Sequence, residues 1–228
     1  EYLEKVPTGE FPFMGTSCCF SWKMMVRKKF PEINEYISES STPMIYTGLQ
    51  LKKKDPNCEI TFIGPCISKK LEALEPEVAE IIDFVITYEE LLGMFLAKGI
   101  EPSEIEVDEV MMDASETGRY YAVGGGVAEA VVKRAQEIRP GLEVDVEAAE
   151  GLANCVKLAQ MAKLGRMDGK LIEGMACQGG CVGGPGVVIA DNKTTKAVKA
   201  FSKASDFKSP ADNVHIPAED RPNDDLLK

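Results

Sequence analysis

The chain has 228 residues and a formal net charge of −11 at pH 7. Its length allows a sizeable core, as one domain or two compact lobes, and its negative charge argues against nucleic acid and anionic membrane surfaces as partners. No run of about 18 apolar residues is present and no signal peptide is visible, so the sequence predicts no membrane span. Its seven cysteines favour metal or redox chemistry in a reducing compartment, taken here as the cytoplasm, over a disulfide scaffold.

The first half of the chain reads as short helices and strands separated by prolines and charged turns. A helix is expected over residues 23–30, and it should end there because Pro31 follows directly. Residues 59–63 and 83–87 are apolar enough to form short buried strands. Thr87 followed by Glu90 predicts a capping box, which opens a helix that runs for about ten residues.

The second half alternates helices with strands. We expect these elements over residues 127–138 (helix), 143–148 (strand), 152–164 (helix) and 170–175 (strand). This alternation predicts an α/β fold with largely parallel sheets, in which ligands bind at the carboxyl ends of the strands. From about Asp206 the chain becomes rich in Pro, Asp and Asn, which predicts a domain over residues 1–205 and a polar tail or linker over residues 206–228.

Two cysteines, Cys177 and Cys181, lie four residues apart in a stretch that contains five glycines. Glycines let main-chain amides approach sulfur atoms closely, as loops that bind iron–sulfur clusters require. A four-iron cluster needs further thiolates, and the chain offers Cys66 and the adjacent pair Cys18 and Cys19. The alternative is a structural zinc site, but such sites usually use paired Cys-x-x-Cys knuckles, which this chain lacks. An iron–sulfur cluster is therefore favoured, and one thiol of the adjacent pair is left over.

Other conspicuous residues have structural interpretations. The run Gly124-Gly-Gly126 lacks the full dinucleotide fingerprint and the Walker lysine, so a packing role is favoured over a phosphate loop. Cys58 and Cys155 are isolated and are predicted to be structural. His215 is the only histidine and lies in a polar stretch, which argues against a Ser-His-Asp triad.

Three segments resemble the signatures of the catalytic domain of [FeFe]-hydrogenases. Residues 16–22, Thr-Ser-Cys-Cys-Phe-Ser-Trp, are similar to Thr-Ser-Cys-Cys-Pro-x-Trp. Residues 64–72, Gly-Pro-Cys-Ile-Ser-Lys-Lys-Leu-Glu, are similar to Met-Pro-Cys-x-x-Lys-x-x-Glu. Residues 173–186 are similar to Glu-x-Met-Ala-Cys-x-x-Gly-Cys-x-x-Gly-Gly-Gly-Gln-Pro. The resemblance runs from Glu1 to about Val188 and implies two lobes, each a twisted and mostly parallel sheet flanked by helices, with a metal cluster in the cleft between them. It also implies an N-terminal portion of the domain that this sequence lacks.

The resemblance implies an H-cluster, which is a [4Fe-4S] cluster joined through one cysteine to a two-iron unit with CO, cyanide and dithiolate ligands. Four thiolates would hold the [4Fe-4S] cluster, those of Cys19, Cys66, Cys177 and Cys181. Cys181 would also bridge to the two-iron unit, Lys69 would hydrogen-bond a cyanide ligand, and Met175 would line the pocket for the diatomic ligands. Cys18 would carry protons beside the open iron site, with Ser38 and Glu1 as further members of the proton path.

Several positions depart from the family signatures. Phe20 replaces a proline, Gly64 replaces a methionine, and Met44 replaces a glutamine. Val187 and Val188 replace the closing Gln-Pro pair. The groups around a metal cluster set its potential and the geometry of its ligands, so these changes resemble the divergent, sensory branch of the family.

The resemblance therefore predicts an enzyme, an [FeFe]-hydrogenase-type domain that activates H2 reversibly, at a low rate and in a sensing role. Its partners would be H2 and protons, an electron-transfer partner that the sequence does not identify, and the maturation proteins that the two-iron unit needs. The alternative is a hydrogenase-like iron–sulfur protein that holds only a [4Fe-4S] cluster, as in the cytosolic iron–sulfur assembly factors. Cys18 and Lys69 favour the first hypothesis, because neither is needed to hold a [4Fe-4S] cluster alone.

Overall fold

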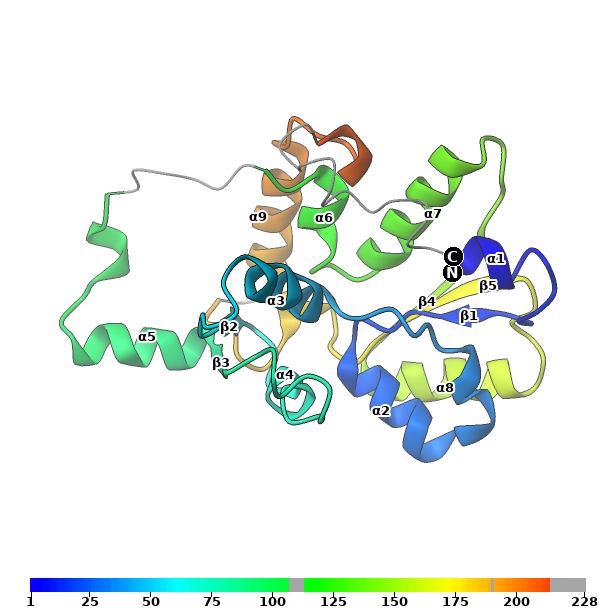
Figure 1. Ribbon diagram of the computed structural model, residues 1–228, viewed down its shortest axis with the longest axis horizontal. Coiled ribbons are helices and arrows are strands. Elements are labelled where there is room, and N and C mark those ends of the chain that lie inside the picture. The colour runs from blue at the N-terminus through cyan, green and yellow to red at the C-terminus, as the bar shows by residue number, and fades with distance from the viewer. Residues whose placement is uncertain (107–112, 190, 214–228) are drawn as a thin grey trace.

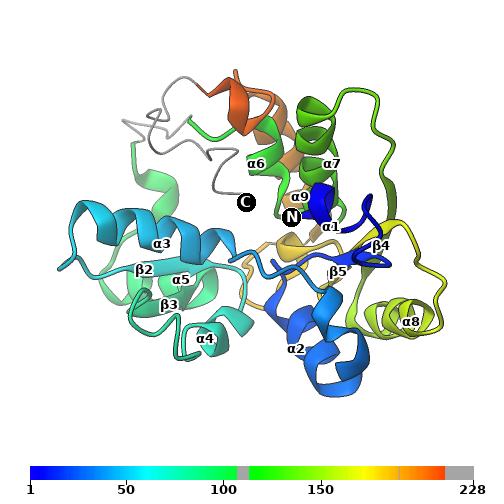
Figure 2. The same cartoon turned by 45° about the vertical axis from the view of Figure 1, so that its right-hand side comes forward.

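The computed structural model describes residues 1–106, 113–189 and 191–213, and within them the chain forms two α/β lobes (Figures 1 and 2). The larger lobe contains three parallel strands in the order β1-β5-β4, and the smaller lobe contains the parallel strands β2 and β3. The strands are β1 Met14–Gly15, β2 Thr61–Gly64, β3 Phe84–Thr87, β4 Asp145–Glu150 and β5 Lys170–Met175. The predicted α/β class, with two lobes built on parallel sheets, is confirmed.

Helices flank both sheets. In the larger lobe, α2 and α8 cover one face of the sheet, whereas α1 and α7 lie on the other face (Figure 1). The α-helices are α1 Tyr2–Lys5, α2 Phe20–Lys29, α3 Pro43–Lys54, α4 Ser68–Glu72, α5 Tyr88–Ala97, α6 Glu116–Tyr120, α7 Gly126–Ile138, α8 Leu152–Lys163 and α9 Asp191–Lys203. The 3-10 helices are η1 Pro31–Tyr36, η2 Pro102–Glu104, η3 Cys181–Gly183 and η4 Pro210–Asp212.

The central strand β5 serves two apolar clusters, one on each face of the sheet. Ile172 packs with Trp22 and α8 on one face, and Leu171 packs with α1 and α7 on the other. Trp22 is fully buried and donates from Nε1 to the carbonyl oxygen of Thr16 at 3.0 Å. Its ring leaves no room for a side chain at Gly174, where a Cβ atom would lie 2.2 Å away. The first signature is thereby packed tightly against the strand that leads into the third.

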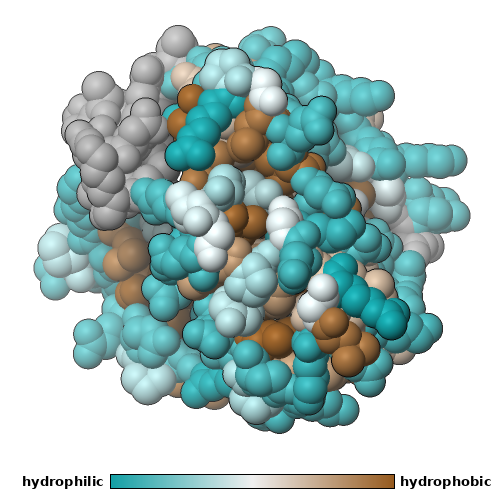
Figure 3. All heavy atoms as spheres, turned by 90° about the vertical axis from the view of Figure 1, so that its right-hand side faces the viewer, coloured by the Kyte–Doolittle hydropathy of each residue, from teal (hydrophilic) through white to brown (hydrophobic). Residues whose placement is uncertain are grey.

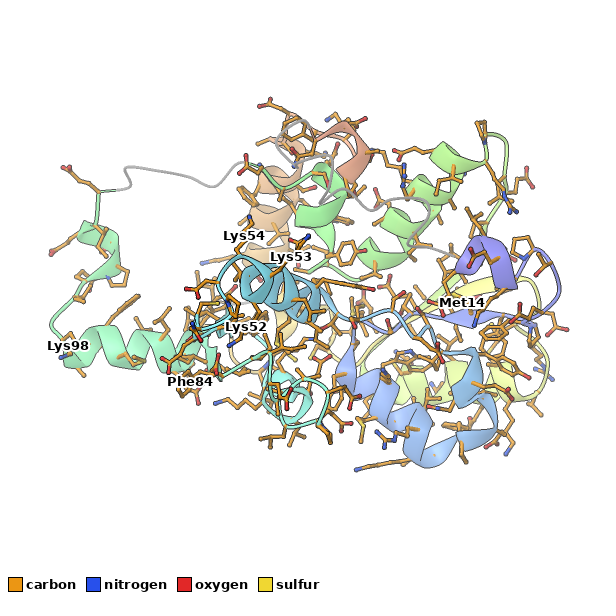
Figure 4. The ribbon with its side chains drawn as sticks, in the orientation of Figure 1. Met14, Lys52, Lys53, Lys54, Phe84 and Lys98 are labelled. Atoms are coloured by element: carbon orange, nitrogen blue, oxygen red, sulfur yellow. The ribbon has the colours of Figure 1, made fainter. Side chains whose placement is uncertain are left out.

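The smaller lobe buries much less of its apolar surface. Thirteen of the twenty large apolar side chains that are exposed in the described chain lie between residues 46 and 105, and α5 has no buried residue. Phe84 on β3 is 55% exposed, and α5 extends away from it to Lys98 (Figure 4). By contrast, the side of the larger lobe shown in Figure 3 is mainly hydrophilic, with separate apolar patches. Most of the apolar core therefore belongs to the larger lobe.

The positions of most elements agree with the sequence analysis. β5 has the predicted bounds, and the capping box at the start of α5 is present. In this box, Oγ1 of Thr87 accepts from the main-chain N–H of Glu90 at 3.1 Å, and the Glu90 carboxylate accepts from the N–H of Thr87 at 2.8 Å. The sequence analysis missed four elements. β1 has only two residues, α4 and α6 are little more than one turn long, and α9 has four lysines among its thirteen residues.

Residues 206–213, which were predicted to begin the polar tail, pack against α6. The main-chain N–H of Glu116 donates to the carbonyl oxygen of Phe207 at 2.7 Å. Residues 214–228, with His215, lie outside the described residues. The division of the chain at Asp206 therefore stays a prediction.

Candidate metal centre

The four predicted cluster ligands lie near the carboxyl ends of strands from both lobes. Cys19 is the N-cap of α2, which follows β1. Cys66 lies two residues after the end of β2, and Cys177 lies two residues after the end of β5. Cys181 begins η3 in the same glycine-rich loop as Cys177. This is the end of a parallel sheet at which α/β proteins bind ligands.

Main-chain hydrogen bonds join the loop after β5 to the smaller lobe. The N–H of Gly186 donates to the carbonyl oxygen of Pro65 at 2.9 Å, and the N–H of Glu89 donates to the carbonyl oxygen of Gly186 at 3.2 Å. A Cβ atom on Gly184 would lie 2.7 Å from the Pro65 carbonyl oxygen, so this close approach requires glycine. The second and third signatures are thereby held together.

The thiols of the four predicted ligands interact electrostatically. Burial, followed by three neighbouring thiols, raises the pKa of Cys181 to about 12. These neighbours are Cys66, Cys19 and Cys177. The pKa of Cys177 is also raised, by burial and then by Cys66 and Cys19. The main-chain N–H of Ala176 donates to Sγ of Cys19 at 3.4 Å. The four thiols therefore lie in one neighbourhood.

The four thiols supply the donor set that a four-iron cluster needs. Within the described residues, no group of three or more Cys, His, Asp or Glu side chains is placed to hold one metal ion. The ligands of a [4Fe-4S] cluster bind different irons, so they surround a cube and do not converge on one point. All four thiols are half-buried, and an N–H donor to sulfur is typical of cluster sites. The residues present thus fit a four-iron cluster.

Cys18 lies beside this group of thiols. Burial is the main reason why the pKa of the Cys18 thiol is raised well above its usual range. The neighbouring Cys19, Glu173 and Cys181 raise this pKa further, and the ammonium of Lys69 lowers it. The same ammonium lowers the pKa of Cys181. This environment therefore favours the neutral thiol of Cys18 over its thiolate, and the ammonium of Lys69 acts in the opposite direction.

Lys69 is held by an acid of its own helix. It lies on α4, is 9% exposed, and pairs through Nζ with Oε2 of Glu72, which is 4% exposed. The two residues are three apart, so they lie on the same side of the helix. A buried ion pair keeps each charge from being left uncompensated. The Lys-x-x-Glu spacing of the second signature therefore supplies the ammonium together with its counter-ion.

Glu1 and Ser38, both predicted for the proton path, are hydrogen-bonded to each other. Oγ of Ser38 donates to Oε2 of Glu1 at 2.5 Å, and Oγ of Ser40 donates to the same oxygen at 3.0 Å. Burial acts to raise the pKa of Glu1, but hydrogen bonds from Ser38, from the main-chain N–H of Glu39 and from Ser40 lower it overall. Among the hydrogen bonds of the described residues, none links Ser38 to Cys18, so the structure joins the predicted path only in part.

The two methionines singled out from the signatures have different surroundings. Met175 ends β5 and is 2% exposed. Met44 lies in the first turn of α3 and packs in the apolar cluster of the smaller lobe, with Ile60, Val78 and Ile82. Met44 is therefore a core residue of the smaller lobe, a role that its position in the signature did not reveal.

Glu173 is a buried acid that the sequence analysis did not select. It is 1% exposed, and its two carboxylate oxygens accept from the N–H groups of Gly125 at 2.7 Å and Ala128 at 2.6 Å. These groups belong to the start of α7, where unpaired N–H groups and the helix dipole favour a carboxylate. Burial raises the pKa of Glu173 in spite of these bonds. The available signal was a single carboxylate between Leu171-Ile172 and Gly174-Met175, in the buried part of β5.

The glycines before α7 have the packing role that the sequence analysis favoured. A Cβ atom on Gly124 would lie 1.8 Å from Oε1 of Glu150, and one on Gly126 would lie 2.2 Å from the carbonyl oxygen of Tyr120. Gly125 has a φ of 83°, which side chains disfavour. The start of α7 therefore binds the carboxylate of Glu173, and its glycines allow close contact with the side chain of Glu150 and the main chain of Tyr120.

The fold and the gathered cysteines define a hydrogenase-like domain with a site for an iron–sulfur cluster. The sequence matches the family described as iron only hydrogenase large subunit, C-terminal domain, over residues 1–185, and the chain belongs to this family.

Curated relatives include both hydrogenases and assembly factors. The chain is 29% identical to the periplasmic [Fe] hydrogenase large subunit of Nitratidesulfovibrio vulgaris, over 82% of this chain and 56% of that protein. It is 26% identical to a cytosolic Fe-S cluster assembly factor of Xenopus tropicalis, over 80% of this chain and 48% of that protein. The chain thus spans about half the length of these two relatives.

A solved structure supports the fold. Apo [FeFe]-hydrogenase from Chlamydomonas reinhardtii superposes with a TM-score of 0.72 at 22% identity, covering 93% of this chain and 72% of that one. In the part of this chain that the structure describes, no helix is both long enough and apolar enough to cross a membrane.

Replacing Glu173 with alanine is expected to destabilise the protein by about 2 to 4 kcal/mol, because two buried N–H groups lose their charged acceptor. Urea unfolding of the metal-free protein, followed by circular dichroism, measures the change. Glu129→Ala is the control, since Glu129 is exposed on α7, the helix whose N–H groups bind Glu173. This variant should change the free energy of unfolding by no more than about 0.5 kcal/mol. Equal losses in the two variants would contradict the role assigned to the buried carboxylate.

Proposed function

We propose that this domain activates H2 reversibly at an H-cluster, at a low rate and in a sensing role. The observation that carries the proposal is the neighbourhood of Cys18, which combines the predicted ligands Cys19 and Cys181 with the ammonium of Lys69. A protein that only held a [4Fe-4S] cluster would need neither the additional thiol nor the buried cation. Membership of the hydrogenase family supports the same function.

The residues of the chain would divide the work as follows. When bound, the H-cluster would supply the heterolytic cleavage of H2. The [4Fe-4S] part would be held by Cys19, Cys66, Cys177 and Cys181. Lys69 would hydrogen-bond a cyanide ligand of the two-iron unit, and Met175 would line the pocket for the diatomic ligands. Cys18 would take up and return a proton at Sγ, and the hydrogen-bonded pair of Ser38 and Glu1 would exchange that proton with solvent.

The low rate is proposed from the positions that depart from the family signatures. A Cβ atom on Gly64 would lie 2.8 Å from the ring of Phe62, so the family's methionine would require Phe62 to move. Phe20 is 6% exposed at the first position of α2, where proline suits a helix because its missing N–H is not needed. Both positions lie within two residues of a predicted ligand. Altered packing there would change the potential of the bound group.

The alternative function is that of an iron–sulfur protein without hydrogenase activity. The identity to the Xenopus tropicalis assembly factor, over 80% of this chain, favours it. The two functions share the [4Fe-4S] cluster and differ in whether a two-iron unit is bound. Maturation proteins and an electron-transfer partner would be needed only for the first.

The compartment is also part of the proposal. The two relatives named above carry periplasmic and cytosolic in their names, so the family does not decide it. We place the domain in the cytoplasm, because none of its seven cysteines is in a disulfide and a reducing compartment keeps thiols available as cluster ligands.

Serine at any one of the four predicted ligand positions should lower the iron content of the reconstituted protein below the roughly four irons that one [4Fe-4S] cluster contains. Iron analysis and visible absorption measure this. Cys58→Ala and Cys155→Ala serve as controls, because Cys155 lies in the core cluster of the larger lobe and Cys58 packs against that of the smaller one. Four irons retained in a serine variant would remove that residue from the ligand set.

Infrared spectroscopy of protein matured with the two-iron unit tests the function itself. We expect bands of CO and cyanide ligands, together with slow H2 oxidation and evolution per occupied site. A reconstituted protein that holds iron but shows neither bands nor turnover would establish the alternative function. Bands accompanied by rates equal to those of a high-turnover hydrogenase would remove the sensing role and keep the hydrogenase function.

Cys18→Ala should leave the iron content and infrared bands unchanged and lower H2 turnover by a factor of about 100 or more, because the proton donor is lost. Cys155→Ala is the control for removing a buried thiol and should keep its turnover. If Cys18→Ala turns over H2 at the wild-type rate, protons leave the site by another route.

A further inference from the structure

Glu150 binds the loop that carries two of the predicted ligands. It is the last residue of β4 and lies half-buried beside Met175, the last residue of β5. Its carboxylate oxygen Oε2 accepts from the main-chain N–H of Gly179 at 2.9 Å and from Nε2 of Gln178 at 3.2 Å. A side chain at the end of one strand therefore holds the loop that follows the neighbouring strand.

Gly179 lies midway between Cys177 and Cys181, and both of its main-chain polar groups have partners. Its N–H donates to Glu150, and its carbonyl oxygen accepts from the N–H of Gly124 at 3.1 Å. Gly179 has a φ of 79°, which side chains disfavour. The turn between the two predicted ligands is therefore fixed at its centre, on one side by a carboxylate and on the other by the main chain.

The charge of Glu150 has no basic partner in the part of the chain that the structure describes. The ion pairs at the other end of β4 join Lys170 to Asp145 and Glu147, and no lysine or arginine pairs with Glu150. The carboxylate packs directly against Gly124, where a Cβ atom would lie 1.8 Å from Oε1. A negative charge is thus held in a fixed place against the loop.

We propose that Glu150 is a positioning residue that fixes the loop of the [4Fe-4S] cluster and lowers the reduction potential of that cluster. The inference rests on the function proposed above for the cluster, and it applies equally to the alternative function, because both share the [4Fe-4S] cluster. Reduction adds one negative charge to the cluster, and a fixed negative charge nearby opposes it. The potentials of such clusters depend on charge and on hydrogen bonds to their sulfurs.

The hydrogen bond to Gly179 acts in the same direction as the charge. An N–H group that donates to sulfur stabilises the reduced cluster and raises its potential. The N–H of Ala176 donates to Sγ of Cys19 at 3.4 Å, whereas the N–H of Gly179 is directed to Glu150. By accepting this N–H, Glu150 keeps one donor of the loop away from sulfur.

The test compares three variants, each reconstituted with its cluster. Glu150→Gln keeps an oxygen that can accept the N–H of Gly179 but removes the charge, and Glu150→Ala removes both. Glu147→Gln is the control, because it removes one charge from the same strand. Successive side chains of a strand alternate between the faces of the sheet, so positions 147 and 150 lie on opposite faces.

The first measurement is the reduction potential, from a redox titration followed by electron paramagnetic resonance. In Glu150→Gln the equilibrium constant for one-electron reduction should rise by a factor of about 3 to 10, which corresponds to about 30 to 60 mV. Glu150→Ala should raise it at least as much, because the N–H of Gly179 also loses its acceptor. The control should change the equilibrium constant less than about twofold, because exposed charges are screened.

The second measurement is the rate at which an iron chelator removes the cluster. Glu150→Gln should lose its cluster at a rate within about twofold of the wild type, and Glu150→Ala at least about fivefold faster, because only the alanine variant releases the turn between the ligands. If the alanine variant does not fold, as circular dichroism would show, Glu150→Gln and Glu147→Gln still decide the effect on the potential.

Several results would overturn the proposal. They are a wild-type potential in Glu150→Gln, equal shifts in Glu150→Gln and Glu147→Gln, and cluster loss that is as fast in the glutamine variant as in the alanine variant. Failure of the wild type to hold any cluster would overturn the proposed function together with this inference. A wild type that holds its cluster, with a potential that does not depend on Glu150, would overturn this inference alone.

Discussion

The candidate site depends on how one glycine-rich loop is fixed to both lobes. On the side of the smaller lobe, the N–H of Gly186 donates to the carbonyl oxygen of Pro65. On the side of the larger lobe, the N–H of Gly124 donates to the carbonyl oxygen of Gly179 at 3.1 Å, and the N–H of Val182 donates to that of Ala122 at 3.1 Å. Because these bonds join main-chain atoms, they position the predicted ligands independently of the side chains around them. A Cβ atom on Gly180 would lie 2.5 Å from the main-chain nitrogen of Gly124, so the loop can pass this close to Gly124 only with glycine at position 180.

A second layer of support lies behind this loop. Glu173 belongs to β5, the strand that leads to the loop, and its carboxylate accepts two N–H groups from the start of α7, which fixes this strand against that helix. Lys69 and Glu72 place an ion pair on the other lobe. Glu173 raises the pKa of the Cys18 thiol, and Lys69 lowers it. Burial is the main cause of the raised pKa of Cys18, and charges from both lobes modify it.

Local patterns in the sequence were enough to predict the elements that deliver the ligands. The apolar run of β5 and the Thr87–Glu90 capping box are local in sequence, so their structures follow from neighbouring residues. The site residues were predicted from three signatures that occur in the family's order. The i,i+3 spacing of Lys69 and Glu72 is also local, so it is compatible with the ion pair that the structure shows. Residues joined over long sequence separations were not predictable in this way.

Glu173 illustrates that limit. Its partners Gly125 and Ala128 lie 48 and 45 residues away, so the pairing depends on how α7 packs against the sheet. Met44 illustrates another limit, because its place in the apolar cluster of the smaller lobe depends on Val78 and Ile82, which are far along the chain. In α9 the four lysines conceal a helix whose position depends on packing against α6 and the glycine-rich loop.

The two lobes make unequal contributions to the fold, and this has a consequence for the site. Three of the four predicted ligands follow elements of the larger lobe, which holds most of the core, whereas Cys66 follows β2 in the smaller lobe. The smaller lobe exposes much of its apolar surface and holds the loop through few main-chain bonds. A cluster bound by thiolates from both lobes would add covalent links across this junction. Because such a ligand binds only the folded arrangement, it stabilises that arrangement by mass action, and most strongly where the protein's own contacts are fewest. If Cys66 and the thiolates of the larger lobe bind one cluster, that cluster would therefore stabilise the junction between the two lobes.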